Sequence, residues 1–308
     1  MSNHRFQLVS AFTAVYVIWG STYLAIRFAI ETIPPFLMAG TRFVIAGGVM
    51  YVVARIAGAP RPSWLHWRSA LVVGALLLLG GNGGVVWAEQ HVASGVTAML
   101  VASEPLWVVL IDWARPGGKR PTHGEAIGLI TGFVGVVWLV NPVSAVGRGA
   151  GGELIGSLVV VIAALSWALG SVVSRNASHV QSPFLDTAMK MFAGGCCLVL
   201  AGTLRGDWGV FELAAVSTRS LWAYLYLIGA GSLIGFTSYI WLLRHTSLAK
   251  ASTYAYVNPV VAIVLGWVLA GEPLTGRVVS ASGVIVLGVV ITTLAKTRRS
   301  TVPAAEVA

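Results

Sequence analysis

Ionisable residues lie inside long apolar stretches of this sequence, where a charge needs a partner, and three of them could bind a solute. Arg42 and Lys190 each stand near the start of such a stretch, and Glu104 lies inside another. A charge at the centre of a bilayer costs about 2.5–3.5 kcal/mol on insertion scales, so it usually faces a partner or a water-filled cavity. The two cations could anchor a solute carboxylate, or they could only snorkel or pack near a helix end. Glu104 could bind an ammonium group or a proton, or it could pair with Arg42.

Two prolines follow polar residues in the middle of apolar stretches, in the pairs Glu104-Pro105 and Asn258-Pro259. Proline lacks a backbone N–H and leaves an upstream carbonyl of a helix without its donor. Within a membrane, neighbouring helices or a water-filled cavity must satisfy that carbonyl. Pro105 and Pro259 are therefore predicted to be kinks beside a cavity, with Asn258 as a binding residue. A purely structural bend is the alternative.

Aromatic and amide side chains complete the set of candidate substrate-binding residues. Deep aromatic rings can pack a core, or they can form flat walls for a solute with an apolar body. A buried asparagine among glycines needs a hydrogen-bond partner, which can be a helix backbone or the solute. The candidates of these two kinds are Trp19, Trp107, Trp167 and Tyr254, and Asn82 with its later counterparts Ser238 and Tyr239.

The sequence carries no enzyme signature, because HExxH, GxSxG and P-loop patterns are absent and no GxGxxG follows a strand. The histidines stand at the ends of apolar stretches or between them, without metal-ligand spacing on one helix face. The adjacent Cys196 and Cys197 are expected to be small packing residues. We therefore expect no catalytic residue, no metal and no cofactor. A gradient of solute or proton must then drive any transport.

The elements that position these residues are apolar runs of membrane-spanning length. Of 308 residues, 56% are hydrophobic and only 10% charged, whereas a soluble domain carries roughly 25% charged residues. A spanning helix needs about 20 mostly apolar residues. The predicted transmembrane helices are Gln7–Ile30, Pro35–Ile56, Ser69–Ala88, Ser94–Trp113, Gly124–Val140, Leu154–Ser174, Pro183–Leu204, Ser220–Leu243, Ala249–Ala270 and Arg277–Ala295.

The basic residues set the orientation of these helices. A formal net charge of +9 could suggest nucleic acid in a soluble protein. Here the cations stand in short segments between apolar runs, without interleaved exposed aromatics, so no nucleic-acid partner is expected. If the N-terminus is cytoplasmic, most of the Lys and Arg residues fall on the cytoplasmic side, as the positive-inside rule requires. Both termini are therefore predicted to be cytoplasmic.

The two halves of the sequence match each other. An odd number of helices in each half forces the second half to enter the membrane upside down, and inverted repeats recur in secondary transporters. We predict a first repeat over 1–142, a Gly-rich linker over 143–153, an inverted second repeat over 154–297 and a disordered cytoplasmic tail over 298–308. The matching residues are Trp19 with Trp167, Arg27 with Arg175, Pro35-Phe36-Leu37 with Pro183-Phe184-Leu185, Arg42 with Lys190, Gly47 with Gly195, Trp87 with Trp241, His91 with His245, Pro105 with Pro259, and Gly135-Val136-Val137 with Gly288-Val289-Val290.

Short motifs lie across nearly the whole chain: Trp19-Gly20-Ser21, Pro35 through Arg42, Glu104-Pro105, Asn258-Pro259, Gly271-Glu272-Pro273-Leu274-Thr275 and Gly283 with Gly288-Val289. Together they resemble the drug/metabolite transporter superfamily, in its ten-helix EamA-type branch. The resemblance is greatest to the exporters of aromatic and other amino acids. It implies an all-α membrane protein of ten transmembrane helices, built from two inverted five-helix repeats around a central cavity. One departure is that Gly118-Lys119-Arg120-Pro121 stands where the second half has Glu272-Pro273.

The leading hypothesis is a secondary transporter that exports amino acids, possibly aromatic ones, or similar small metabolites by alternating access. We expect a monomer in a bacterial-type inner membrane, with the lipid bilayer and a small-molecule substrate as its partners. An antiporter of phosphorylated or nucleotide-sugar solutes is the second hypothesis, although such cargo needs several clustered basic groups. A membrane enzyme or scaffold without transport is the third.

Overall fold

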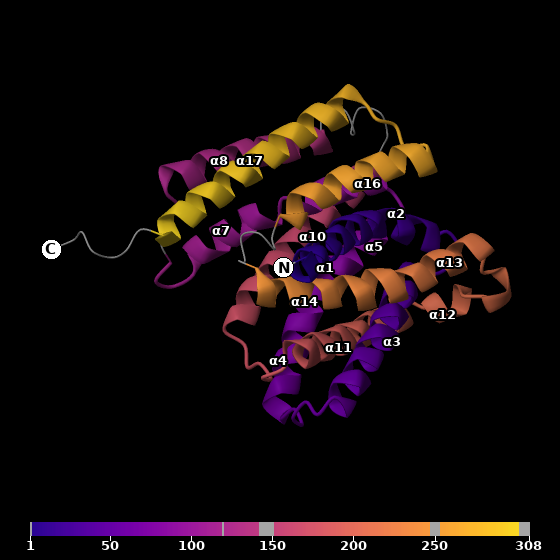
Figure 1. Cartoon of the computed structure of the whole chain (residues 1–308). Coiled ribbons are helices and arrows are strands. Elements are labelled where there is room, and N and C mark those ends of the chain that lie inside the picture. The colour runs from indigo at the N-terminus through magenta and orange to yellow at the C-terminus, as the bar shows by residue number, and fades with distance from the viewer. Residues whose placement is uncertain (1, 119, 142–150, 247–252, 302–308) are drawn as a thin grey trace.

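Helices make up all the regular structure in the described part of the chain (Figure 1). The computed structural model describes residues 2–118, 120–141, 151–246 and 253–301. Among these, nine helices are long and apolar enough to cross a membrane, and a shorter apolar tenth spans Tyr254–Ala270. The predicted all-α membrane fold is confirmed.

The first half contains five helical spans, of which three are interrupted. The first, third and fourth predicted helices are each divided into shorter segments, whereas the second and fifth are continuous. The elements are α1 (Ser2–Thr13), the π-helical η1 (Ala14–Ile18), α2 (Trp19–Ala29), α3 (Pro35–Ile56), α4 (Trp64–Gly74), the π-helical η2 (Ala75–Asn82), α5 (Gly83–Ala88), α6 (Ser94–Val101), α7 (Glu104–Ala114) and α8 (His123–Val140).

The second half follows the same order. Its third span is again interrupted by a π-helical segment, η4. The elements are α10 (Gly151–Arg175), α11 (Pro183–Leu204), α12 (Asp207–Val210), the 3₁₀ turn η3 (Leu213–Ala215), α13 (Thr218–Tyr226), η4 (Leu227–Ile234), α14 (Gly235–His245), α16 (Tyr254–Ala270) and α17 (Gly276–Thr301).

Several predicted boundaries differ from those observed. Helix α10 begins at Gly151, inside the predicted linker, and α17 continues to Thr301. Residues 298–301 of the predicted disordered tail are therefore helical, because no glycine or proline stands between Gly288 and Pro303 to end the helix. Residues 142–150 and 302–308, and the predicted helix start at Ala249, lie outside the described residues.

Glycines bring the two halves into close contact along two helix pairs, α3 with α11 and α8 with α17 (Figure 1). A Cβ added at Gly47 would lie 2.6 Å from the backbone nitrogen of Phe192, and one added at Gly195 would lie 2.7 Å from that of Val44. Gly47 and Gly195 are matching positions of the two halves, so the contact is reciprocal. Small residues allow this close approach of backbones in membranes.

The second pair gives a prediction about stability. On α17, a Cβ added at Gly288 would collide with the backbone of Gly132 on α8, whereas one added at Gly283 meets nothing within 4 Å. We expect Gly288→Ala to lower the free energy of unfolding by about 1–3 kcal/mol through overpacking. Thermal unfolding of the purified protein in detergent measures this. Gly283→Ala is the matched control, and equal melting temperatures of the two variants would contradict the prediction.

Candidate substrate site

Arg42 lies on α3 and is only 3% exposed. Its Nε donates a hydrogen bond of 2.9 Å to the Ser232 hydroxyl on η4. Its Nη1 is buried and has no hydrogen-bond partner within the described part of the chain. No ion pair joins it to an acidic side chain there. A buried guanidinium with an open donor is suited to bind a carboxylate, which it can hold through two parallel N–H groups.

An aromatic cluster adjoins the same π-helical segment. The Trp19 ring lies 5.1 Å from Phe236, 5.2 Å from Tyr239 and 5.1 Å from Tyr254, measured between ring centroids. Its indole Nε1 donates to the Gly231 carbonyl at 3.1 Å. Arg42 and Trp19 therefore contact neighbouring residues of η4. A cation and an aromatic wall meet at this place, which suits a solute with an acidic and an apolar part.

The π-helical segments η2 and η4 stand at corresponding places in the two halves, and both contain glycines. Trp19 packs against Gly235, just after η4, and Trp167 packs against Gly81 in η2. Each tryptophan belongs to the half opposite to its glycine. Single π-helical turns occur frequently at functional sites, because they interrupt the regular backbone pairing of an α-helix. The repeat thus predicts a pair of tryptophans, and in the structure each of them packs against a helix of the other half.

Asn258, Asn82 and Ser238 occupy different surroundings. Asn258 is 7% exposed, and with its NH₂ group facing two carbonyls it donates to the backbone oxygens of Tyr16 at 3.1 Å and Tyr254 at 3.2 Å. Its amide therefore joins α16 to the first span. Asn82 ends η2, and its Oδ1 is buried without a partner among the described residues. Ser238 is half-buried on α14, next to the clustered Tyr239.

Glu104 begins α7, directly after a break in the fourth span at residues 102–103. Pro105 stands in the first turn of α7, where the missing N–H costs least. The Ser171 hydroxyl of α10 lies beside the Glu104 carboxyl. Trp107, one turn further on, packs edge-on against Phe133 at 4.8 Å, and its buried Nε1 has no partner in the described part of the chain. Pro259, by contrast, lies inside the continuous helix α16.

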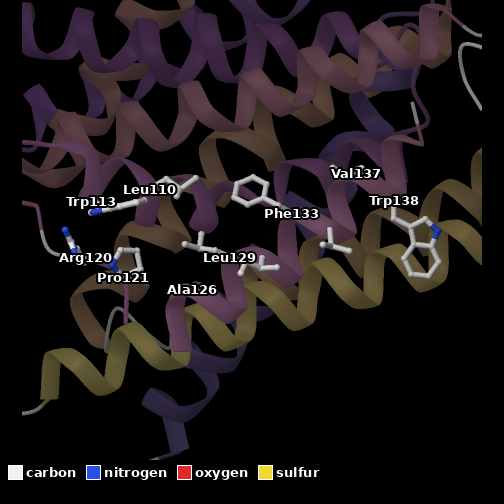
Figure 2. Close-up of a pocket in the computed structure, with 11 residues that line it drawn as sticks. Leu110, Trp113, Arg120, Pro121, Ala126, Leu129, Phe133, Val137 and Trp138 are labelled. Carbon is white, nitrogen blue, oxygen red and sulfur yellow. The ribbon is translucent and has the colours of Figure 1, made fainter. Parts of the chain in front are cut away.

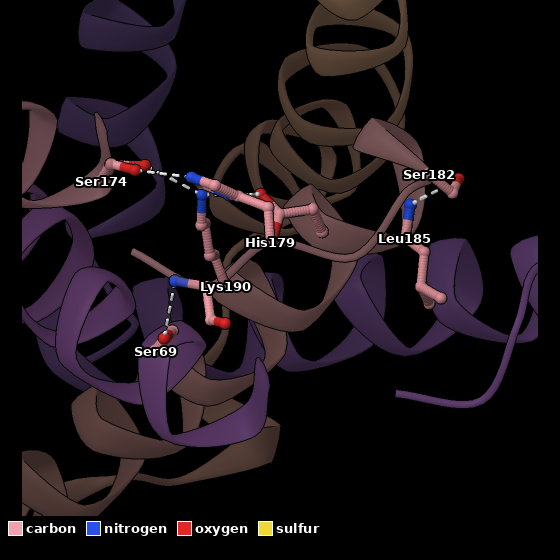
Figure 3. Close-up of polar contacts among 8 residues, drawn as sticks. Ser69, Ser174, His179, Ser182, Leu185 and Lys190 are labelled. Atoms are coloured by element: carbon pink, nitrogen blue, oxygen red, sulfur yellow. Dashed lines mark hydrogen bonds and ion pairs between the residues drawn. The ribbon is translucent and has the colours of Figure 1, made fainter. Parts of the chain in front are cut away.

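Lys190 does not join Arg42. Its Nζ lies 2.7 Å from an Asp186 carboxylate oxygen and donates to the Ser174 hydroxyl at 3.0 Å. His179 contacts the same Asp186 at 3.1 Å, and Figure 3 shows Lys190 and His179 converging on Ser174. The lysine is thus neutralised near the ends of α10 and α11. Sequence comparison of the two halves placed the cations at matching positions, but an acidic residue one helical turn before Lys190 gives it a partner.

Glu272 forms a contact that we call the outer latch, after the side on which the predicted orientation would place it, made of Glu272, Arg27, Ser94 and Gly95. One carboxylate oxygen accepts from the Ser94 N–H and hydroxyl, each at 2.8 Å, and pairs with Arg27 at 3.2 Å. The other accepts from the Gly95 N–H at 3.1 Å. Gly271 has a φ of 64° and ends α16 in the left-handed region, which turns Glu272 toward the start of α6. A carboxylate there satisfies free N–H groups of the helix.

A second contact, the inner latch, lies at the C-terminal end of α10 and consists of Asp112, Arg175 and Lys296, with Arg115 at 3.7 Å from the same Asp112. Asp112 lies 3.2 Å from Arg175 and 3.0 Å from Lys296. Arg175 is the repeat partner of Arg27, so the same arginine position contacts an acid in each half. The inner latch is more exposed, at 20% for Asp112 against 7% for Glu272. Neither acid was among the predicted site residues, although Glu272 lies in a motif noted in the sequence.

A groove of about 910 Å³ lies on the outside of α7 and α8 (Figure 2). Its walls include the outward-facing Ile130, Val137 and Trp138 and carry Arg120 at one end. None of the predicted substrate residues lines it. An apolar groove of this kind on a membrane-facing surface suits acyl chains rather than a polar solute.

The sequence also matches the model of a known protein family. The model described as the EamA-like transporter family matches residues 8–141 and again 154–294. The chain belongs to the EamA-like transporter family. Two matches in one chain agree with the two-repeat membrane fold.

Relatives of this transporter cover nearly its full length. The "Uncharacterized inner membrane transporter YedA" of Escherichia coli K12 is 38% identical over 94% of this chain and 91% of its own. The "Uncharacterized transporter YoaV" of Bacillus subtilis is 26% identical over 93% of this chain and 96% of its own. One solved crystal structure superposes with a TM-score of 0.63 at 22% identity, covering 94% of this chain and 97% of that one, which shows the same fold.

Proposed function

We propose that this EamA-family transporter exports amino acids, aromatic ones included, or similar small metabolites across the inner membrane by alternating access. The inner-membrane assignment is supported by its Escherichia coli relative, which is named as an inner membrane transporter. The apolar helices and the bias of basic residues support cytoplasmic termini. The export of amino acids is supported by the chemistry of the site around Arg42.

Arg42 carries the proposal. A buried guanidinium that lacks an acidic partner is unfavourable in an empty site. A solute carboxylate would supply the missing charge and accept from the open Nη1. The same interior holds only one such unpaired cation among the described candidates, because Lys190 is bound to Asp186. One anionic group is therefore favoured over a phosphate or nucleotide sugar, which needs several clustered cations.

The remaining groups suit the other parts of an amino acid. The Trp19, Tyr239 and Tyr254 rings form a wall beside Arg42's partner segment η4. An electrostatic effect of Glu104 on Tyr239 and Tyr254 supports a role for its carboxyl group beside this wall. A carboxylate there could hold the solute ammonium. Asn82 Oδ1 and Trp107 Nε1, which have no hydrogen-bond partner among the described residues, would add further polar contacts for a solute.

The two latches support alternating access. In the outer latch, Glu272 joins Arg27, near the end of the first span, to the start of α6 in the fourth span. In the inner latch, Asp112 on α7 of the fourth span pairs directly with Arg175 at the end of α10. Opening one latch while the other stays closed would expose the interior to one side of the membrane. The matching positions of Arg27 and Arg175 give the two halves an equivalent contact to break.

Flux measurements in proteoliposomes that contain only this protein test the function. We expect protein-dependent efflux of a labelled aromatic amino acid, and we expect unlabelled amino acids to compete with it. Drugs and nucleotide sugars should compete weakly. Liposomes with an Arg42→Gln variant are the matched control. Absence of flux for every amino acid, or competition by nucleotide sugars alone, would overturn the proposal.

A further inference from the structure

Glu89 is a buried carboxyl group that the proposed transport site does not use. It follows the last residue of α5 and is only 3% exposed. Both of its carboxyl oxygens are buried, and neither has a hydrogen-bond partner in the described part of the chain. A buried carboxylate without a partner is strongly disfavoured, because it has lost its hydration and gained nothing in return.

Two charged residues of the outer latch act on this group. Glu272 and Arg27 both act electrostatically on Glu89, and the buried Tyr23 hydroxyl also feels its charge. Arg27 is already paired with Glu272 at 3.2 Å, so the closed latch has one cation for two carboxyl groups. His91, two residues further along the chain, packs instead on Trp87 at 4.9 Å. The closed latch therefore has one negative charge too many when both acids are ionised.

The protonated form of Glu89 removes this excess. Burial, and after it the Glu272 carboxylate, raise the pKa of Glu89 well above its ordinary value, while Arg27 opposes them. Opening the latch would separate these groups and return Glu89 to water, where its pKa is near 4.3. The closed state thus binds the proton more tightly than the open state. By linkage, protons favour closure, and this preference is lost as the pH rises through the closed-state pKa.

We propose that Glu89 is a proton-binding site whose occupancy controls closure of the outer latch. The proton binds to Glu89 when the latch closes, and Glu89 releases it to water when the latch opens. If the transport cycle is the one proposed above, an acidic outer compartment would favour return of the empty carrier from its outward-open state. This part rests on the proposed function, whereas proton-linked closure does not.

Distance measurements between two spin labels test closure without any solute. The labels are placed by Gln90→Cys and Gly276→Cys in a chain with both native cysteines replaced by alanine. Both positions are exposed, and an added Cβ at Gly276 meets nothing within 4 Å. The labelled protein is studied in lipid nanodiscs between about pH 5 and about pH 9, a range that spans a raised carboxyl pKa. We expect a short-distance, closed population that falls as the pH rises.

Three variants determine which residue titrates. Glu89→Gln, which is neutral at every pH, should stay closed across the range. Glu89→Asp should keep a pH-dependent transition, and this variant also guards against a folding defect in the glutamine variant. Glu31→Gln, at an exposed carboxyl paired with Arg219, should titrate like the parent chain. A parent distance that does not change with pH, or an unchanged transition in Glu89→Gln, would overturn the proposal. Loss of flux with an intact transition would count only against the proposed function.

Discussion

Replacing Arg42 by alanine should reduce the ratio kcat/KM for efflux by about 10- to 100-fold. A hydrogen bond to a charged group contributes about 1.5–3 kcal/mol, and each 1.4 kcal/mol is a factor of about ten in affinity. Arg42 is 3% exposed and has an open Nη1 donor. Because the side chain is buried, bulk water would not replace the bond that the solute loses when Arg42 is removed. We expect most of the change in KM, because the guanidinium acts by binding the solute.

Initial rates of efflux from proteoliposomes at several internal concentrations measure this effect. Arg42→Lys should recover only part of the affinity, since an ammonium cannot hold a carboxylate through two parallel N–H groups. Arg55→Ala is the matched control, because Arg55 lies near the end of the same helix and bonds to the Ala59 carbonyl. An Arg42→Ala variant with normal KM, normal kcat and normal thermal stability would show that no carboxylate binds there.

Removing the acid of the outer latch should be the most destabilising single change that we propose. Glu272→Ala leaves Arg27 without its partner and deprives the Ser94 and Gly95 N–H groups of their acceptor. Leaving buried donors unsatisfied costs about 1–3 kcal/mol each. We expect a loss of about 3 kcal/mol or more in the free energy of unfolding, since Glu272 is 7% exposed. Arg27, which is 38% exposed, contributes the smaller part.

Thermal or denaturant unfolding in one detergent compares the latch variants. Glu272→Gln should lose less stability than Glu272→Ala, because the amide oxygen can still accept from the start of α6. Glu153→Ala is the matched control at an ion pair of 3.8 Å to Arg277 whose acid is 52% exposed, and exposed pairs contribute about 0–1 kcal/mol. If Glu272→Ala melted together with Glu153→Ala, the latch would not hold α2 to α6.

The fold could be predicted from the sequence because its signals are long and repeated. Runs such as Pro35–Ile56 and Pro183–Leu204 agree with α3 and α11 at both ends, since a proline begins each helix and the apolar run sets its length. The interruptions at η2 and η4 were not predicted. Glycine-rich apolar sequence is compatible with both α- and π-helical pairing, so composition alone does not reveal where a helix widens.

The candidate site was predictable only in part, because the partner of a charged side chain depends on which residues the fold brings close to it. Trp19, Tyr239 and Tyr254 do cluster, as deep aromatic residues can. Lys190 matched Arg42 in the sequence, but it binds Asp186, and a one-turn spacing between opposite charges was the available signal. Glu89 gave no signal, since it stands at the end of an apolar run, where an acidic residue is ordinarily hydrated.

Trp19 and Trp167 each pack against the opposite half, so each half completes the interior packing of the other. The indole of one half fills the space left by a glycine of the opposite half, at Gly235 and at Gly81. Neither half on its own would complete its interior, so an isolated half would leave an indole and a bare glycine seam facing lipid. Joining both halves in one polypeptide ensures that each indole packs against its glycine in the other half. A substitution at one of these positions therefore changes the packing of residues encoded in the opposite half of the gene.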